Sequence, residues 1–260
     1  MKGNEYNWKL PDAKTLESLY CADKMSSLAI AQKYRVTKAA VRHKLKRHEI
    51  NLRSMSESQT LIANYISLTS SALAFIDGLL LGDGCIFPSP RGLSAQYKHS
   101  DKNPDYIVWL ANQLSDMGIE IETRDYPKVS KLASKWYRDF MIIRERWYPL
   151  GKKQVPPDIK LEPVTLMNWY IGDGNYHIPA GDGGGEQVTI AMQYDELGKN
   201  LLRTKLYELG IATTSYKDCI YFRSSSRQHF FTYMIKVNIT IPECYKYKFP
   251  RRYYHANEQS

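Results

Sequence analysis

Two aspartates in matching surroundings are the residues of this chain best suited to chemistry. Asp83 and Asp173 each occupy the centre of a Gly-Asp-Gly triplet that ends an apolar segment with helical periodicity. A carboxylate in the last turn of a helix lies among carbonyl oxygens that repel it, so it needs a cation. If the two segments pack together, they form an all-oxygen cluster that suits hard divalent cations, above all Mg²⁺. The sequence therefore predicts a metal site at Asp83 and Asp173, with carbonyl ligands from Gly82 and Gly172.

The segments that carry these aspartates are predicted to be helices, 71–83 and 163–173. The hydroxyl pair Ser70-Ser71 suits the N-cap of the first helix, and Gly84 suits a left-handed cap at its end. Gly78 and Gly82 lie four residues apart, so one face of this helix can approach another backbone closely. Pro163 is favoured in the first turn of the second helix. A lone Gly-Asp-Gly is usually a helix-stop turn, but two instances that end apolar helices favour a site.

The spacing of these features indicates an internal duplication. Asp83 and Asp173 are 90 residues apart, and the similar contexts of Gly118 and Gly210 are 92 residues apart. A nearly constant offset across both halves is the signature of a repeated unit.

These residues resemble the paired motifs of the LAGLIDADG homing endonucleases, in the single-chain, two-motif form found in mobile introns. The stretches 151–156 (GKKQVP) and 247–250 (YKFP) resemble two further signatures, and the resemblance covers roughly residues 70–250. It implies an α+β class and a pseudo-twofold, duplicated αββαββα fold with saddle-shaped antiparallel sheets. That domain would span 71–260, with half one at 71–150 and half two at 163–250.

The resemblance also implies an activity. Such an enzyme makes a metal-dependent, staggered double-strand cut in a long asymmetric DNA site, using two or three Mg²⁺ ions for which Mn²⁺ or Ca²⁺ substitute. Bound divalent cations lower the pKa of an attacking water and stabilise the leaving oxygen.

Four further catalytic residues are expected from the resemblance. Lys153 and Lys248 match lysines beside the metals, where a compact cation polarises the solvent or offsets phosphate charge. Lys152 and Lys246 are close enough to be the matching residues instead, and any of these lysines could be an ordinary surface residue. Gln193 and His99 are expected at equivalent places on the strand after each motif, where they would order the attacking water.

One residue departs from the family pattern. Asp77 places an acid inside the first helix, where the motif has a small or apolar residue. We expect its side chain to face away from the helix interface and to pair with a basic residue.

The alternating segments between the helices are predicted to form sheets that lie on DNA. In half one we expect strands at 119–124 and 135–143, joined by a basic loop with Lys128 and Lys131. Outward polar and basic residues of the type that reaches bases and phosphates are the expected DNA contacts. In half one they are Arg91, Gln96, Lys98, Arg124, Lys128, Lys135 and Arg138, and in half two His177, Lys217, Arg223 and Arg227.

The N-terminal part has a character of its own. The chain carries a formal charge of +9, and residues 1–60 hold 12 of its 36 lysines and arginines against six acids. Ser26 or Ser27 suits the N-cap of a short second helix, and Thr37 suits the N-cap of a third helix at 38–48. This spacing resembles a helix-turn-helix domain, assigned to 1–56 and followed by a linker at 57–70. Its third helix would present Lys38, Arg42, His43 and Lys46 to a major groove; the alternative is a helical packing module with a solvated basic face.

Composition excludes several other classes. The four cysteines are scattered without zinc-ligand spacing, so we expect free thiols, and the apolar run near 79 is too short to span a bilayer. We expect a monomeric, cytoplasmic or organellar protein with double-stranded DNA as its partner and no membrane contact. Two alternatives are a non-cleaving transcription regulator, which loss of the aspartates would mark, and an RNA-binding maturase with intron RNA as its partner.

Overall fold

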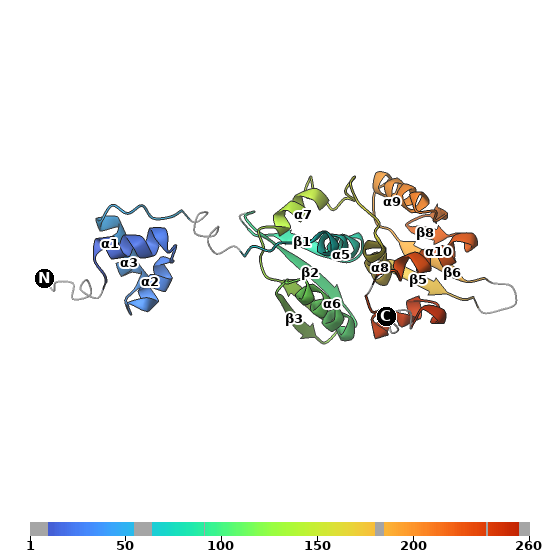
Figure 1. The fold of residues 1–260 in the computed structure, drawn as a ribbon, viewed down its shortest axis with the longest axis horizontal. Coiled ribbons are helices and arrows are strands. Elements are labelled where there is room, and N and C mark those ends of the chain that lie inside the picture. Colours follow the sequence, from blue (N-terminus) through green and yellow to red (C-terminus); the bar gives the residue numbers. More distant parts are fainter. Residues whose placement is uncertain (1–9, 55–63, 91, 180–184, 238, 255–260) are drawn as a thin grey trace. The chain divides into compact units, whose positions relative to one another are not determined.

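A computed structural model describes residues 10–54, 64–90, 92–179, 185–237 and 239–254. The chain divides into two compact units, Met1–Ala63 and Asn64–Ser260 (Figure 1).

The first unit is a small helical bundle. Its elements are α1 (Ala13–Glu17), the π-helical turn η2 (Ser18–Ala22), α2 (Ser27–Lys33) and α3 (Lys38–Arg47). Of the two serines predicted as N-cap of the second helix, Ser26 accepts the hydrogen bond from Ala29 N, and the predicted N-cap Thr37 is confirmed because it accepts one from Ala40 N. Arg53 closes the bundle by donating to the carbonyl of Tyr20 at 2.8 Å. The core of this unit is Leu10, Leu16, Leu19, Tyr20, Ile30, Ala31, Val41 and Leu45.

The second unit repeats one order of elements twice. Half one contains α5 (Ser70–Leu81), β1 (Cys85–Pro88), β2 (Ala95–Asp101), α6 (Pro104–Asp116), β3 (Ile121–Tyr126), β4 (Val129–Ser134) and α7 (Phe140–Trp147). Half two contains α8 (Pro163–Asp173), β5 (Gly174–His177), β6 (Gln187–Ala191), α9 (Glu196–Glu208), β7 (Thr213–Tyr216), β8 (Cys219–Phe222) and α10 (Ser224–Met234). The 3₁₀ turns η3 (Glu243–Lys248) and η4 (Arg251–Tyr253) follow. This is the predicted duplicated αββαββα arrangement.

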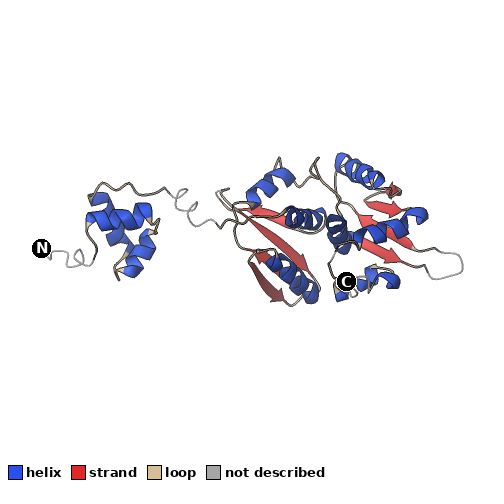
Figure 2. Ribbon diagram, viewed as in Figure 1, coloured by secondary structure: helices blue, strands red, loops and turns tan. Residues whose placement is uncertain are grey.

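Each half builds one antiparallel sheet of four strands, in the orders β1-β2-β4-β3 and β5-β6-β8-β7 (Figure 2). Alternate residues of the central strands are buried, so each sheet has one face in the core and one face free of it. A single hydrophobic core runs through both halves. Among the described residues, no helix combines the length and apolar character needed to cross a membrane.

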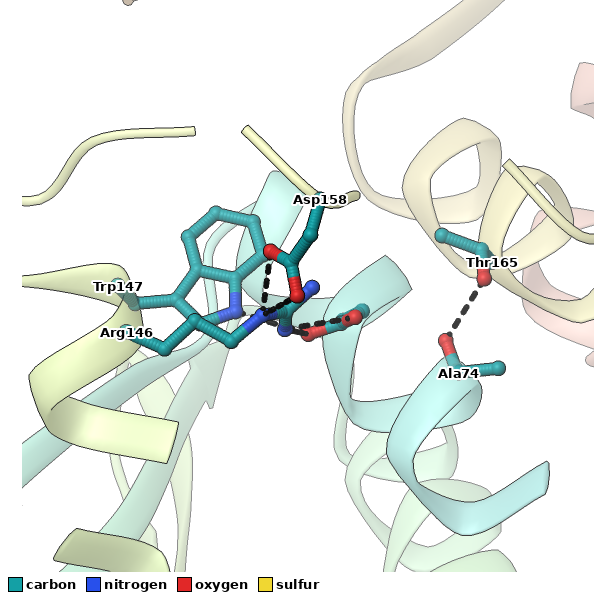
Figure 3. A network of polar contacts seen from close by, with 6 residues as sticks. Ala74, Arg146, Trp147, Asp158 and Thr165 are labelled. Carbon is teal, nitrogen blue, oxygen red and sulfur yellow. Dashed lines mark hydrogen bonds and ion pairs between the residues drawn. The ribbon is translucent and has the colours of Figure 1, made fainter. Parts of the chain in front are cut away.

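α5 and α8 lie side by side where the two halves meet (Figure 1). The close approach predicted at Gly78 is confirmed, because a Cβ built there would lie 2.4 Å from the carbonyl oxygen of Thr165. A hydrogen bond of 3.0 Å from the Thr165 hydroxyl to the carbonyl of Ala74 also joins the helices (Figure 3). The N-cap predicted at Ser70-Ser71 is wrong, since Thr69 accepts the hydrogen bond from Ala72 N at 3.1 Å. The expected left-handed cap at Gly84 is wrong as well, since Gly84 is absent from the described glycines with positive φ. Its small size is needed instead because a Cβ would lie 2.6 Å from the carbonyl oxygen of Leu79.

The strand predicted at 135–143 is also wrong. A tight turn with Lys128 after β3 returns the chain directly into β4, and residues 140–147 form α7. Phe140, Ile143 and Trp147 are buried at helical spacing, so the tertiary core selects a helix here.

Asp77 behaves as expected. Its carboxylate accepts hydrogen bonds from Arg146 Nη1 at 2.6 Å and from Trp147 Nε1 at 2.8 Å, and Arg146 also pairs with Asp158 (Figure 3). The hydrogen-bonding capacity of this buried carboxylate is therefore used by side chains of α7, away from the interface between α5 and α8.

Candidate active site

The C-terminal ends of α5 and α8 meet and bring the two aspartates together. A Cβ built on Gly82 would lie 3.8 Å from both Asp173 Oδ2 and the Cα of Gly172. Asp83 and Asp173 line one cavity of about 310 Å³. Its wall consists of Leu81, Gly82, Asp83, Gly84, Cys85, Lys153, Asp173, Ala191, Gln193 and Tyr194.

The electrostatics of this pair match a cation site. Burial and the nearby Asp83 carboxylate raise the pKa of Asp173 to about 7, while Lys153 and Lys248 act in the opposite direction. Two carboxylates held this closely therefore resist ionising together until positive charge is supplied.

The available donors fit a hard divalent cation. In the part of the chain that the structure describes, no group of three or more His, Cys, Asp and Glu side chains could hold a metal. A cation at Asp83 and Asp173 would thus meet two carboxylates, with its other positions left to carbonyls, water or a phosphate. This oxygen-only set suits Mg²⁺ or a similar ion and does not suit soft metals.

Lys153 and Lys248 each lie at one helix end, and they share one corresponding acceptor, the carbonyl of Gly82 or Gly172. Lys153 Nζ donates to the carbonyls of Gly82 at 2.8 Å and Gly84 at 2.9 Å. Lys248 Nζ donates to the carbonyls of Ile171 at 2.6 Å and Gly172 at 2.8 Å. Burial lowers the pKa of both ammonium groups, and the aspartate charges oppose that shift.

The neighbouring lysines lie elsewhere. Lys152 is exposed, and Lys246 pairs with Glu243 at 2.6 Å. Since Gly82 and Gly172 already accept a lysine proton each, a metal could use only their remaining lone pair. Side-chain carboxylates are therefore the main ligands on offer.

Gln193 and His99 do not occupy equivalent positions, so that prediction is wrong. Continuing the pairing of β1 with β2 places His99 opposite Gly84. Gly84 corresponds to Gly174, which pairs with Ile190, so the residue of half two that corresponds to His99 is Ile190. His99 is 3% exposed, its Nδ1 lies 3.1 Å from the Tyr97 hydroxyl, and burial lowers its pKa. Gln193 is exposed on the cavity wall. Of the two, Gln193 has the freedom to order a water there.

Two tyrosines of the site carried no signal in the sequence. The Tyr194 hydroxyl donates to the carbonyl of Leu81 at 2.5 Å and ties half two to the end of α5. The Tyr245 ring lies 4.6 Å from Lys248 Nζ, and its hydroxyl donates to Asp101 at 2.6 Å. Both contacts join segments more than 100 residues apart, which local patterns do not reveal.

The predicted DNA contacts in half one fall into three groups. Gln96, Lys98 and Arg124 lie on the face of the sheet opposite the core, and Lys128 is exposed in the turn after β3. Partners within the protein occupy Gln96, which donates to the carbonyl of Ser134 at 2.5 Å, and also Lys135, which pairs with Glu120, and Arg138, which donates to the Tyr65 hydroxyl at 3.1 Å. The last, Arg91, lies outside the described residues.

In half two the predicted contacts are less uniform. His177 is exposed on β5, and Lys217 lies in the turn between β7 and β8 with a positive φ of 51°. Arg223 follows β8, and Arg227 lies in the first turn of α10, donating to the carbonyl of Phe222 at 3.2 Å. The last two residues are therefore off the strands.

In the first unit, all four predicted contacts of α3 are exposed. Lys38, Arg42, His43 and Lys46 lie outward, while Val41 and Leu45 of the same helix are buried.

Comparison with known proteins gives consistent results. Residues 73–230 match the model of the LAGLIDADG DNA endonuclease family. The uncharacterized protein MJ1098 of Methanocaldococcus jannaschii is 29% identical over 150 residues, which cover 54% of this chain and 55% of that protein. The cytochrome b mRNA maturase bI2 of Debaryomyces hansenii is 27% identical over 123 residues, or 41% of this chain and 47% of that protein. The chain thus matches about half the length of each relative.

The fold has solved counterparts as well. The homing endonuclease I-WcaI, solved bound to its DNA recognition sequence, superposes with a TM-score of 0.59 at 17% identity. The superposition covers 78% of this chain and 96% of that one. This likeness establishes the fold of the second unit.

Proposed function

The chain belongs to the LAGLIDADG DNA endonuclease family, and on that premise we propose that it is a site-specific homing endonuclease that cuts both strands of a long asymmetric DNA site. The observation that carries the proposal is the pairing of Asp83 and Asp173 at the helix ends, each beside a lysine. Both aspartates are retained, which argues against the non-cleaving regulator.

Asp83 and Asp173 would hold the divalent cations, with Mg²⁺ as the first choice and Mn²⁺ or Ca²⁺ as substitutes. Cations bound there lower the pKa of water and neutralise charge on the phosphodiester. The duplicated arrangement supports one cut on each strand from a single chain, so the active species would be a monomer.

The lysines and Gln193 complete the machinery. Lys153 and Lys248 are positioned to offset the charge that develops on each phosphate, and their hydrogen bonds to backbone carbonyls fix them in advance. Gln193 is positioned on the cavity wall to orient the attacking water. We assign no direct role to His99, because it is buried beside the Tyr97 hydroxyl and does not line the cavity.

We assign DNA binding to the outward sheet faces and to α3. The exposed α3 residues suit an adjacent major groove, where they would lengthen the footprint on one side of the cut. The first unit has its own core, so it would act as a helix-turn-helix module.

The test is cleavage of duplex DNA in Mg²⁺ by aspartate variants. Asp83→Asn and Asp173→Asn keep the shape of the side chain and remove its charge, so each should abolish double-strand cutting and leave DNA affinity within a few fold. Wild-type cutting by both variants would overturn the assignment.

The lysines are tested with neighbouring residues as matched controls. Lys153→Met and Lys248→Met should each slow single-turnover cleavage roughly tenfold or more, as removal of one electrostatic stabiliser does. Lys152→Met and Lys246→Met should leave the rate unchanged. The reverse pattern would show that the wrong lysines have been assigned.

The maturase alternative rests on one observation, the 27% identity to the mRNA maturase of Debaryomyces hansenii. It would add intron RNA as a partner and is tested by splicing of a host intron with the Asp83→Asn protein. Intron splicing by that variant, which cannot cut DNA, would show that the maturase function is separate from DNA cleavage.

A further inference from the structure

The two sheets are copies of one design, but their outward faces differ in chemistry. Strand pairing fixes which positions correspond. In half one Cys85 pairs with Lys98 and Lys98 with Ala133, and in half two Asn175 pairs with Thr189 and Thr189 with Tyr221. Cys85 and Asn175 each come directly after a Gly-Asp-Gly triplet, so their strand partners Lys98 and Thr189 correspond to one another.

The same argument extends along the sheets. Arg124 pairs with Lys131 in half one, and Tyr216 pairs with Cys219 in half two. All three basic residues on the outward strand face of half one are thus neutral in half two. In the described strands, the outward face of half two carries Asn175, His177, Gln187, Thr189, Ala191, Thr214, Tyr216, Cys219 and Tyr221, with no lysine or arginine among them.

The basic face of half one is poorly neutralised within the protein. Lys131 stands directly opposite Arg124, and like charges at facing positions of a sheet are destabilising. Arg124 has one acidic neighbour, Glu122, at 3.6 Å, and both side chains are more than 60% exposed, so this ion pair contributes little. An anionic partner would relieve the repulsion between Lys131 and Arg124.

Charged and neutral side chains read DNA differently. Lysine and arginine contact phosphates and the major-groove acceptors of guanine, and each phosphate contact makes binding more sensitive to salt. Asparagine and glutamine pair with adenine, and the methyl groups of threonine and alanine contact the methyl group of thymine. Asn175 and Thr189 therefore favour A·T pairs in half two, whereas Gln187 is common to both halves because Gln96 stands at the matching position of half one.

We propose that the two halves of the nuclease unit bind chemically different half-sites. Half one binds a G·C-containing half-site through Lys98, Arg124 and Lys131, with strong salt dependence. Half two binds an A·T-rich half-site through neutral contacts of its strands, and its salt dependence is weaker because Lys217, Arg223 and Arg227 lie off the strands. The inference rests on the proposed endonuclease function and adds the composition and polarity of its target.

The first experiment selects cleaved duplexes from a random-sequence DNA library with the full-length wild-type protein in Mg²⁺. The enriched site should contain one G·C-containing half and one A·T-rich half. If the wild type cleaves nothing, the proposed function fails, and this inference fails with it. If it cleaves sites whose halves have the same composition, the inference alone is overturned.

The second experiment assigns each half-site to a half of the protein. Lys98→Gln and Arg124→Gln should relax base preference in the G·C-containing half only, and each should lower the slope of log Kd against log salt by about 1. Asn175→Ala and Gln187→Ala should relax the A·T-rich half and leave the slope unchanged. Relaxation in the opposite halves would overturn the proposal.

Two further variants test whether the position of the charge matters, rather than the removal of any lysine. Lys205→Gln removes a lysine on α9 that pairs with Glu208 at 3.1 Å, and it should change neither preference nor slope. Thr189→Lys places in half two the residue found at the matching position of half one, and it should raise the slope by about 1. A slope that falls in Lys205→Gln as much as in Lys98→Gln, or that stays constant in Thr189→Lys, contradicts the proposal.

Discussion

Replacing Gly78 by alanine should destabilise the nuclease unit, although alanine is the better helix former. A Cβ at this position would meet the carbonyl oxygen of Thr165 at 2.4 Å, its Cα at 2.9 Å and the Cβ of Asn168 at 2.8 Å. Two of these atoms belong to the backbone of α8, so they cannot move aside without shifting that helix. The side chain of Thr165 is itself bonded to Ala74, which resists the shift.

The magnitude follows from two opposing terms. Alanine gains about 0.8–1.0 kcal/mol over glycine in a helix interior. Overpacking a close-packed interface typically costs ~1–3 kcal/mol and sometimes more, and the short backbone contacts here place Gly78→Ala at or above the top of that range. The net loss is then about 2 kcal/mol, which lowers Tm by roughly 4–8 °C in a unit of this size.

Gly172→Ala is the matched control for stability. A Cβ there would meet the Cα of Gly82 at 3.7 Å, an ordinary contact, so this variant should keep or slightly raise Tm. Unfolding in urea followed by tryptophan fluorescence reports on this unit, because the buried Trp147 and Trp169 both lie in its core. A Gly78→Ala protein as stable as Gly172→Ala would refute the close packing of α5 on α8.

Three further predictions concern charge. The pKa of Asp173 is about 7 in the folded protein against an ordinary value of 3.8, so between these pH values the folded state binds more protons and this group's contribution to stability falls as pH rises. Asp173→Asn should therefore gain Tm over the wild type increasingly across this range in EDTA, and parallel Tm curves would contradict the assigned shift. Asp77→Asn should lower the free energy of unfolding in urea by an amount near the lower end of ~3–5 kcal/mol, because Arg146 loses a buried partner but keeps Asp158. A decrease below ~1 kcal/mol would count against this network. Arg42→Gln with Lys46→Gln in α3 should lower the salt slope of DNA binding by about 2 and spare cleavage at saturating protein, whereas an unchanged slope would remove α3 from the interface.

The resemblance to the LAGLIDADG motifs implied the duplicated fold of the second unit, and the structure confirms it. Helical periodicity and turn residues are local signals, and they placed the helices expected at 71–83 and 163–173 within two residues of the observed α5 and α8. The strand expected at 135–143 failed because residues 140–147 are apolar enough for either structure, and packing against the core selects the helix α7.

In the candidate site too, the sequence identified some residues and only the folded chain identified others. The two Gly-Asp-Gly triplets marked Asp83 and Asp173 in advance, because a carboxylate at a helix end is an electrostatic anomaly visible in the sequence. The sequence left Lys153 and Lys152 as alternatives, and likewise Lys248 and Lys246. Side chains one or two residues apart point in different directions, and only the folded chain shows which reach the helix-end carbonyls.

Other features were decided by tertiary structure alone. Strand register separated His99 from Gln193, because a shift of a few residues along a strand moves a side chain between the core and the cavity wall. Tyr194 reaches the site, and Tyr245 is anchored beside Lys248, through hydrogen bonds that span more than 100 residues. The contrast between the two outward faces likewise depends on pairing, since Lys98 can be matched with Thr189 only after the strands are aligned by their hydrogen bonds. Local composition determined which elements form and where charge gathers, and long-range pairing determined which side chains share a surface.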